Sequence, residues 1–231
     1  NKSRQAPVCQ SCAAKMKNLQ VITLVVGDLA ANCYLVFSPK KPQKALVIDP
    51  GGDAKQILAA LKKHQIERPE FILTHGHIDH IAALNHLRSV FENAPTAIHP
   101  ADAHMLPDAA ANLSYFMENS QTFQPANRLL KDGETLTINA VPFEILHVPG
   151  HSPGSIAIYS SDEKILFSGD CLFAESIGRT DLPGGSPHQM TQSLQKLCQL
   201  PQDTRVFPGH GSNELLEIIL KENGYVQNFA K

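Results

Sequence analysis

This sequence of 231 residues lacks an excess of charge of either sign, a long apolar run and a cysteine framework. Its formal net charge is −2, which gives no electrostatic reason to expect a nucleic acid or an anionic membrane as a partner. No apolar run approaches the roughly 20 residues of a membrane-spanning helix, and no secretory signal pattern is visible. The five cysteines are scattered and odd in number, which indicates reduced thiols in a cytosol-like compartment. We therefore expect a cytoplasmic protein.

The first residues differ from the rest in composition. Residues 1–15 contain basic but no acidic side chains, and Cys9-x-x-Cys12 has no second cysteine or histidine pair nearby that would complete a zinc site. We expect residues 1–15 to be a leader, tag or disordered extension, and residues 16–231 to form a single domain. A basic, acid-free segment is also typical of organelle-targeting peptides, so import into an organelle stays open.

The pattern of apolar residues predicts an alternation of strands and helices. Strands are predicted at residues 19–26, 33–37, 44–48, 71–73, 96–99, 134–139, 141–147, 156–159, 164–167 and 204–207. Helices are predicted from Asp53 as N-cap to about residue 65, and at residues 81–91, 189–200 and 213–221. This order predicts an α/β (α+β) fold in which two mixed sheets lie face to face with helices outside.

Residues 101–131 are the least regular part, rich in Ala, Asn and Pro. They predict a loop and a helix that pack over a sheet. The alternative is that their larger apolar side chains face a substrate. These are Met105, Tyr115, Phe116 and Met117.

The most informative motif is His75-x-His77-x-Asp79-His80, directly after an apolar run. On an extended backbone His75 and His77 point the same way, whereas the adjacent Asp79 and His80 point differently. One short segment can therefore supply two neighbouring metal ions. Two close metals with nitrogen and oxygen ligands indicate hydrolysis.

Three later segments repeat one pattern, in which a ligand-type residue follows an apolar run and a glycine. The residues are His151, Asp170 and His210. Glycine lets the backbone turn tightly and pass close to a bound ion. Because strand ends collect at one edge of a sheet in α/β folds, we expect these three strand ends and that of the His75 motif to deliver their ligands to one such edge.

The order and spacing of these seven side chains resemble the metallo-β-lactamase superfamily over residues 19–210. Three further segments are similar to short bacterial glyoxalase II-like (hydroxyacylglutathione hydrolase-like) thioester hydrolases: residues 32–36, 47–51 and 176–185. The resemblance implies a four-layer αββα sandwich. It also implies a reaction in which a metal-bridging hydroxide attacks an S-acyl thioester such as S-lactoylglutathione, a small-molecule substrate.

The resemblance assigns the ligands to two divalent metal ions. The first would be held by His75, His77 and His151, the second by Asp79, His80 and His210, with Asp170 bridging both. Asp79 would also be catalytic, because it can orient the hydroxide and accept its proton. Imidazole and carboxylate ligands suit zinc, which we expect first, and also iron or manganese.

Other polar residues have two interpretations each. Asp49 either accepts a hydrogen bond from a ligand histidine or caps a turn. Arg179 either pairs with Asp181 or binds a substrate carboxylate. His99 ends a predicted strand and either has a structural role or supports a ligand, whereas Cys171 is expected to pack inward.

Two observations leave the substrate open. Larger glyoxalase II enzymes carry a C-terminal helical domain that binds glutathione, and because only 21 residues (211–231) follow His210 we expect no such domain. The segment at Gly178-Arg179-Thr180-Asp181 also resembles persulfide dioxygenases, which are oxidoreductases with one iron ion. Persulfide dioxygenase, lactonase and β-lactamase activities are therefore alternatives. The oligomeric state is left open.

Overall fold

The computed structural model describes residues 16–229, so the prediction for residues 1–15 lies outside the described residues. Twelve strands form two six-stranded sheets in the described part. Sheet A has the order β1 (Gln20–Val26), β2 (Ala31–Ser38), β3 (Lys41–Ile48), β4 (Arg68–Ile72), β5 (Thr96–Ile98), β6 (Arg128–Leu129). Sheet B has the order β12 (Glu214–Leu215), β11 (Arg205–Pro208), β10 (Ile165–Gly169), β9 (Ile156–Ser160), β8 (Val141–His147), β7 (Thr135–Ile138).

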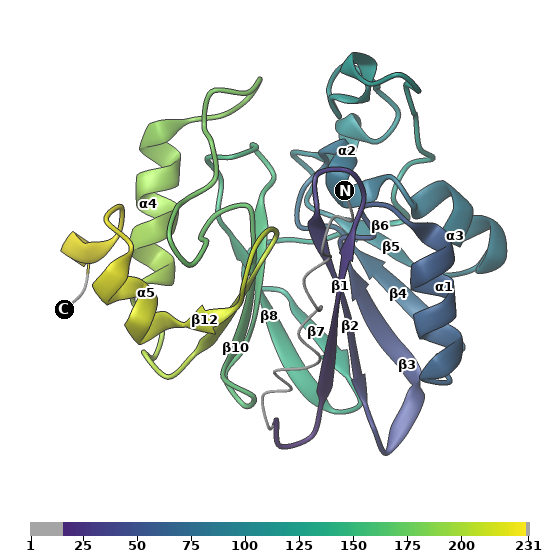
Figure 1. Ribbon diagram of the computed structural model, residues 1–231, viewed down its shortest axis with the longest axis horizontal. Helices are drawn as coiled ribbons and strands as arrows, with labels where there is room; N and C mark the ends of the chain where they lie inside the picture. Colours follow the sequence, from purple (N-terminus) through teal and green to yellow (C-terminus); the bar gives the residue numbers. More distant parts are fainter. Residues whose placement is uncertain (1–15, 230–231) are drawn as a thin grey trace, which may run out of the picture.

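Both sheets are mixed, as predicted. In sheet A the first three strands are antiparallel and β3 to β6 are parallel. In sheet B only the pair β10–β11 is parallel. Figure 1 shows the two sheets face to face, with helices on both outer sides. The predicted αββα sandwich is therefore confirmed.

The helices cover the outer faces of the sheets. On the side of sheet A lie α1 (Ala54–Lys63), α2 (Ile78–Ile81) and α3 (Leu84–Val90), and on the side of sheet B lie α4 (Pro187–Leu197) and α5 (Leu216–Glu222) (Figure 1). Three short 3₁₀ turns complete the fold: η1 (Ala103–Met105), η2 (Ser114–Phe116) and η3 (Gln227–Phe229). In the described residues no helix is long and apolar enough to cross a membrane.

Three apolar clusters fill the three contacts between the four layers. Because side chains alternate across a strand, Leu35 and Phe37 of β2 pack toward the helices whereas Val36 packs toward sheet B. The central cluster between the sheets includes Phe143 and Phe167, both fully buried. The third cluster joins sheet B to α4 and α5.

The predicted helix over residues 81–91 is confirmed only in part, because α2 ends at Ile81 and α3 covers Leu84–Val90. The backbone N–H of Ala83 donates to Pro50 O at 2.9 Å, so it does not form the helical bond to Asp79 O. Gly51 lies against the same carbonyl, where a Cβ would come within 1.8 Å of Asp79 O. This close approach divides the segment and places Asp79 and His80 inside α2.

Other boundaries also differ from the predictions. The predicted helix at 213–221 begins only at Leu216, because the two preceding residues pair with β11. Asp53 precedes α1 as predicted, but its side chain accepts from Gly27 N at 2.9 Å and caps no helical N–H. Residues 101–131 form 3₁₀ turns and the short strand β6, which the sequence did not indicate.

Candidate metal centre

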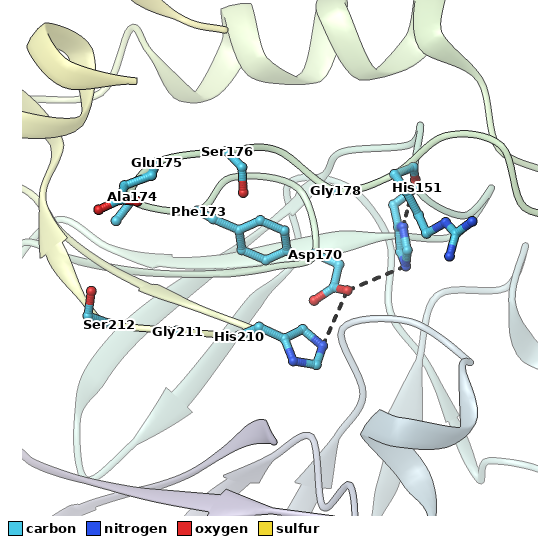
Figure 2. Close-up of a pocket in the computed structure, with 11 residues that line it drawn as sticks. His151, Asp170, Phe173, Ala174, Glu175, Ser176, Gly178, His210, Gly211 and Ser212 are labelled. Atoms are coloured by element: carbon cyan, nitrogen blue, oxygen red, sulfur yellow. Dashed lines mark hydrogen bonds and ion pairs between the residues drawn. The ribbon is translucent and has the colours of Figure 1, made fainter. Parts of the chain in front are cut away.

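Three of the expected ligands come from sheet B. His151 follows β8, Asp170 directly follows β10, and His210 follows β11. Figure 2 shows the three side chains converging at one side of a pocket. The Asp170 carboxylate lies between the two imidazoles, with Oδ2 at 3.6 Å from both His151 Nε2 and His210 Nε2.

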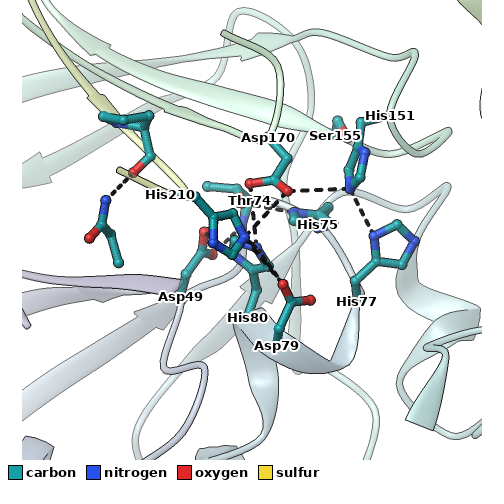
Figure 3. Close-up of polar contacts among 12 residues, drawn as sticks. Asp49, Thr74, His75, His77, Asp79, His80, His151, Ser155, Asp170 and His210 are labelled. Carbon is teal, nitrogen blue, oxygen red and sulfur yellow. Dashed lines mark hydrogen bonds and ion pairs between the residues drawn. The ribbon is translucent and has the colours of Figure 1, made fainter. Parts of the chain in front are cut away.

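The other four side chains come from sheet A. His75 and His77 lie in the loop after β4, and Asp79 and His80 lie in α2. Figure 3 shows that they meet the residues of sheet B. The expectation that one sheet edge supplies the site is therefore wrong, since the ends of strands from both sheets build it.

The structure brings His75, His77 and His151 together as one group. Each offers a ring nitrogen, and these atoms lie within 4.8 Å of one another. His77 Nδ1 is 2.9 Å from His151 Nε2. All three side chains are buried, so no bulk water competes for these nitrogens.

Asp79, His80 and His210 form a second group of the same size, also within 4.8 Å. His210 Nε2 lies 3.2 Å from Asp79 Oδ2 and 3.3 Å from His80 Nε2. Asp170 adjoins both groups, because its Oδ1 is 3.4 Å from His80 Nε2 while its Oδ2 faces His151. The two groups are therefore neighbours with one carboxylate between them.

The electrostatics of the first group suit a cation. Burial, together with neighbouring imidazoles, lowers the pKa of His75 well below its usual value and that of His77 to about 3. Both rings are therefore neutral and keep a lone pair. Among the described residues, His75 Nε2, His77 Nε2 and Asp170 Oδ1 are buried without any hydrogen-bond partner. Since buried polar atoms are nearly always paired, these atoms fit metal ligation.

The second group stabilises positive charge. Burial would lower the pKa of His80, but the carboxylates of Asp170 and Asp79 outweigh burial and raise it well above its usual value. Burial would likewise raise the pKa of Asp79, yet His80 and His210 hold it well below its usual range. The Asp79 and Asp170 carboxylates therefore favour a bound cation at the place where the two groups adjoin.

Asp49 supports a ligand, which favours the first of its two interpretations. Its carboxylate accepts from Thr74 N at 2.7 Å and Thr74 Oγ1 at 2.6 Å, and it lies 3.0 Å from His80 Nδ1 (Figure 3). Asp49 is close enough to His75 and His80 to form a third possible ligand group. Because its oxygens already have these partners, we assign it to orienting the His80 ring.

Asp102 is a buried residue of the site that the sequence did not indicate. Its Oδ1 accepts from Gly154 N at 2.6 Å, and its Oδ2 accepts from Ser152 Oγ at 2.6 Å and Gly76 N at 3.2 Å. These donors lie beside His151 and between the first two ligand histidines. Asp102 therefore ties together the two loops that carry the first group.

The remaining candidates take mainly structural positions. Arg179 pairs with Asp181 through Nε–Oδ1 at 2.7 Å and Nη2–Oδ2 at 2.8 Å, while the Arg179 carbonyl lies 2.8 Å from His151 Nδ1. His99 stacks on His147, with ring centroids 4.1 Å apart. Cys171 is fully buried, as predicted.

A pocket of about 550 Å³ opens beside the centre. Figure 2 shows the Phe173 ring next to Asp170 and His210, at 6.2 Å from the His210 ring between centroids. Its lining residues are His151, Asp170, Phe173, Ala174, Glu175, Ser176, Gly178, Arg179, His210, Gly211 and Ser212. A second pocket of about 420 Å³ is lined by Asp79 and Met117 among other residues. Met105, in contrast, is buried.

Comparisons with known proteins agree with this geometry. The family model described as "Metallo-beta-lactamase superfamily" matches residues 26–210. The protein named hydroxyacylglutathione hydrolase GloC from Haemophilus influenzae is 34% identical, over 84% of this chain and 91% of that protein. The crystal structure of BLEG-1 B3 metallo-beta-lactamase is similar at a TM-score of 0.83 and 37% identity, covering 89% of this chain and 99% of that one. The crystal structure of TTHA1623 in a di-iron-bound form is similar at a TM-score of 0.79 and 34% identity, covering 89% of this chain and 100% of that one.

Proposed function

The chain belongs to the metallo-β-lactamase superfamily, and we propose that it is a dinuclear metal-dependent hydrolase of S-acyl thioesters such as S-lactoylglutathione. The observation that carries the proposal is the pair of adjacent ligand groups that share Asp170 and open into a pocket. The relative from Haemophilus influenzae, named as a hydroxyacylglutathione hydrolase, supports the substrate class.

The proposed ligands follow the two groups. One divalent ion would be held by His75, His77 and His151, and the other by Asp79, His80 and His210, with Asp170 shared. When bound, such ions supply a water of lowered pKa and polarise the substrate carbonyl. We expect zinc, with manganese or iron as alternatives, and the related di-iron structure supports iron. Elemental analysis of the purified protein measures both identity and stoichiometry.

Asp79 is the proposed catalytic residue. Its side chain is partly exposed, at 18%, so it reaches the solvent side of the centre, whereas His80 beside it is fully buried. The depressed pKa of Asp79 keeps it ionised, so it can orient an attacking water, and it would accept the proton of that water once a bound ion has lowered the pKa of the water. The water oxygen adds to the acyl carbon, the C–S bond breaks, and the thiolate leaves. Because a thiolate is a good leaving group, we assign no separate acid.

Arg179 is a proposed substrate contact. It lines the pocket, and its exposed guanidinium is held by Asp181. A carboxylate of the thiol carrier would replace Asp181 as the partner of the guanidinium. Arg179→Lys keeps the charge but loses the paired geometry, so we expect a higher KM for S-lactoylglutathione with little change in kcat.

Hydrolysis of S-lactoylglutathione by protein of measured metal content tests the proposal, with Asp170→Asn as the control variant. Turnover that is lost in Asp170→Asn would support a thioesterase. No turnover by protein carrying two ions per chain would refute it. The similarity to BLEG-1 favours β-lactam hydrolysis as the second candidate. A chromogenic cephalosporin tests that candidate in the same preparation, and lactone and persulfide substrates test the remaining alternatives.

We further propose that the partner is a small-molecule thioester, that neither nucleic acid nor a membrane is bound, and that the protein is cytoplasmic. Gel-shift assays with nucleic acid, co-sedimentation with lipid vesicles and localisation of a tagged protein test these proposals.

A further inference from the structure

The second ligand group is completed across the interface between the sheets. Asp79 and His80 belong to α2, on the side of sheet A, whereas His210 belongs to the loop after β11 of sheet B. His210 is flanked by Gly209 and Gly211, and Gly211 has a φ of 77°. Because glycine restricts the backbone least, this loop needs other contacts to hold the His210 ring opposite its partners.

Asn32 on β2 supplies those contacts. Its side-chain Nδ2 donates to Pro208 O and to Gly211 O, each at 2.9 Å, and its backbone N–H donates to Gly209 O at 2.7 Å. These three carbonyls lie on both sides of His210 in the sequence. Next to Asn32, Ala31 forms an isolated antiparallel bridge with His210. The strand of sheet A therefore holds the ligand loop of sheet B from both sides.

We propose that Asn32 is a positioning residue that fixes His210 opposite Asp79 and His80 and so sets the metal affinity of the second ligand group. Asn32 is only 2% exposed, and its primary amide is the one group of this size that donates two hydrogen bonds from a single nitrogen. The inference rests on the proposed dinuclear centre. It assigns a role to the segment at residues 32–36, which the catalytic proposal leaves unused.

The inference predicts an effect on one metal ion only. Asn32 has no hydrogen bond to the loops that carry His75, His77 and His151. Loss of its amide donors therefore loosens His210 while the first group keeps its ligands and the Asp102 contacts. Supporting partners of metal ligands typically change affinity by about 10–100-fold.

Asn32→Asp is the principal variant, because it keeps the shape and removes both Nδ2 donors. Asn223→Asp is the matched control, because it makes the same exchange of a side-chain amide for a carboxyl group. Asn223 is fully buried, and its Nδ2 also donates to two loop carbonyls, Phe173 O at 3.1 Å and Ser176 O at 2.9 Å. Tyr34→Phe is a milder second variant, because it removes only the hydroxyl that donates to Pro208 O at 2.5 Å.

Zinc titration of the metal-free proteins by calorimetry, with competition by a chromophoric chelator, gives the affinity of each ion. We expect Asn32→Asp to lower the affinity for the second ion by about 10–100-fold and to leave that for the first within threefold, while Asn223→Asp leaves both affinities within threefold. Circular dichroism of the metal-free proteins establishes that each variant is folded. If Asn32→Asp does not fold, Tyr34→Phe decides, with an expected weakening of the second ion alone by threefold or more.

Equal weakening of both ions, or two unchanged ions, in the folded variant would overturn the inference and leave the proposed function intact. Fewer than two ions in the wild-type protein would overturn the dinuclear centre, and the inference with it.

Discussion

Asp102 offers a quantitative test of how the first ligand group is built. Its carboxylate is fully buried and accepts two backbone N–H groups, from Gly76 and Gly154, and the hydroxyl of Ser152. Asp102→Ala removes all three acceptor contacts. The hydroxyl retains a partner in Ser155 Oγ at 2.7 Å, but the two N–H groups lose theirs.

A buried donor without a partner costs about 1–3 kcal/mol, so Asp102→Ala should destabilise the metal-free fold by about 2–6 kcal/mol. Asp102→Asn keeps one acceptor oxygen, which can serve Ser152 and Gly76. In this variant the amide nitrogen takes the place of Asp102 Oδ1, which lies 2.6 Å from Gly154 N. The Gly154 N–H therefore loses its acceptor. We expect this variant to lower the free energy of unfolding by about 1–3 kcal/mol.

Urea unfolding followed by circular dichroism measures both costs. Asp108→Ala is the control, because Asp108 also accepts two backbone N–H groups, from Ala110 and Ala111, but is exposed. In the variant, water can bond to these two N–H groups in place of the carboxylate. We therefore expect the free energy of unfolding to fall by less than about 1 kcal/mol. The reasoning is refuted if Asp102→Ala costs less than about 1 kcal/mol, or no more than Asp108→Ala.

Three further variants test other parts of the structure. Gly209→Ala should lower metal content in a folded protein, measured by elemental analysis, because its Cβ would lie 2.1 Å from Asp170 Oδ1. Phe143→Ala should cost about 3–5 kcal/mol in urea unfolding, because it empties the core between the sheets. The hydrogen bond from Arg128 lowers the pKa of Glu134 below its usual value of 4.5. The stability that this bond adds is therefore present above pH 4.5 and is lost as the pH falls through the lowered pKa. Arg128→Met should remove that dependence, worth less than about 1 kcal/mol at this partly exposed pair.

The parts of the fold that the sequence predicted correctly have local causes. The strands of the central core appear as apolar runs between turn residues, and the helix at α4 shows its apolar residues at helical spacing. The seven candidate ligands follow strands at glycine-containing turns, so their residue types and positions are visible in the sequence. Their assembly from two sheets is not, because strand order is a property of the whole chain.

The features that the sequence did not indicate depend on contacts between distant segments. Asp102 lies in an irregular segment, and its three donors are 26, 50 and 52 residues away along the chain. The break between α2 and α3 depends on a bond from Ala83 N to Pro50 O, and β6 forms only by pairing with β5. No local propensity encodes such contacts, so the apolar periodicity predicted one continuous helix where the structure has a break.

The two ligand groups are held in different ways, and this connects metal binding to the packing of the sandwich. Both contain residues from both sheets, so an ion that binds either group joins the sheets only when they are folded together. A ligand that binds the folded state alone stabilises it in proportion to the logarithm of its concentration. In the first group Asp102 ties the loops through three hydrogen bonds, whereas in the second the His210 loop is held mainly by Asn32 and Tyr34 of β2.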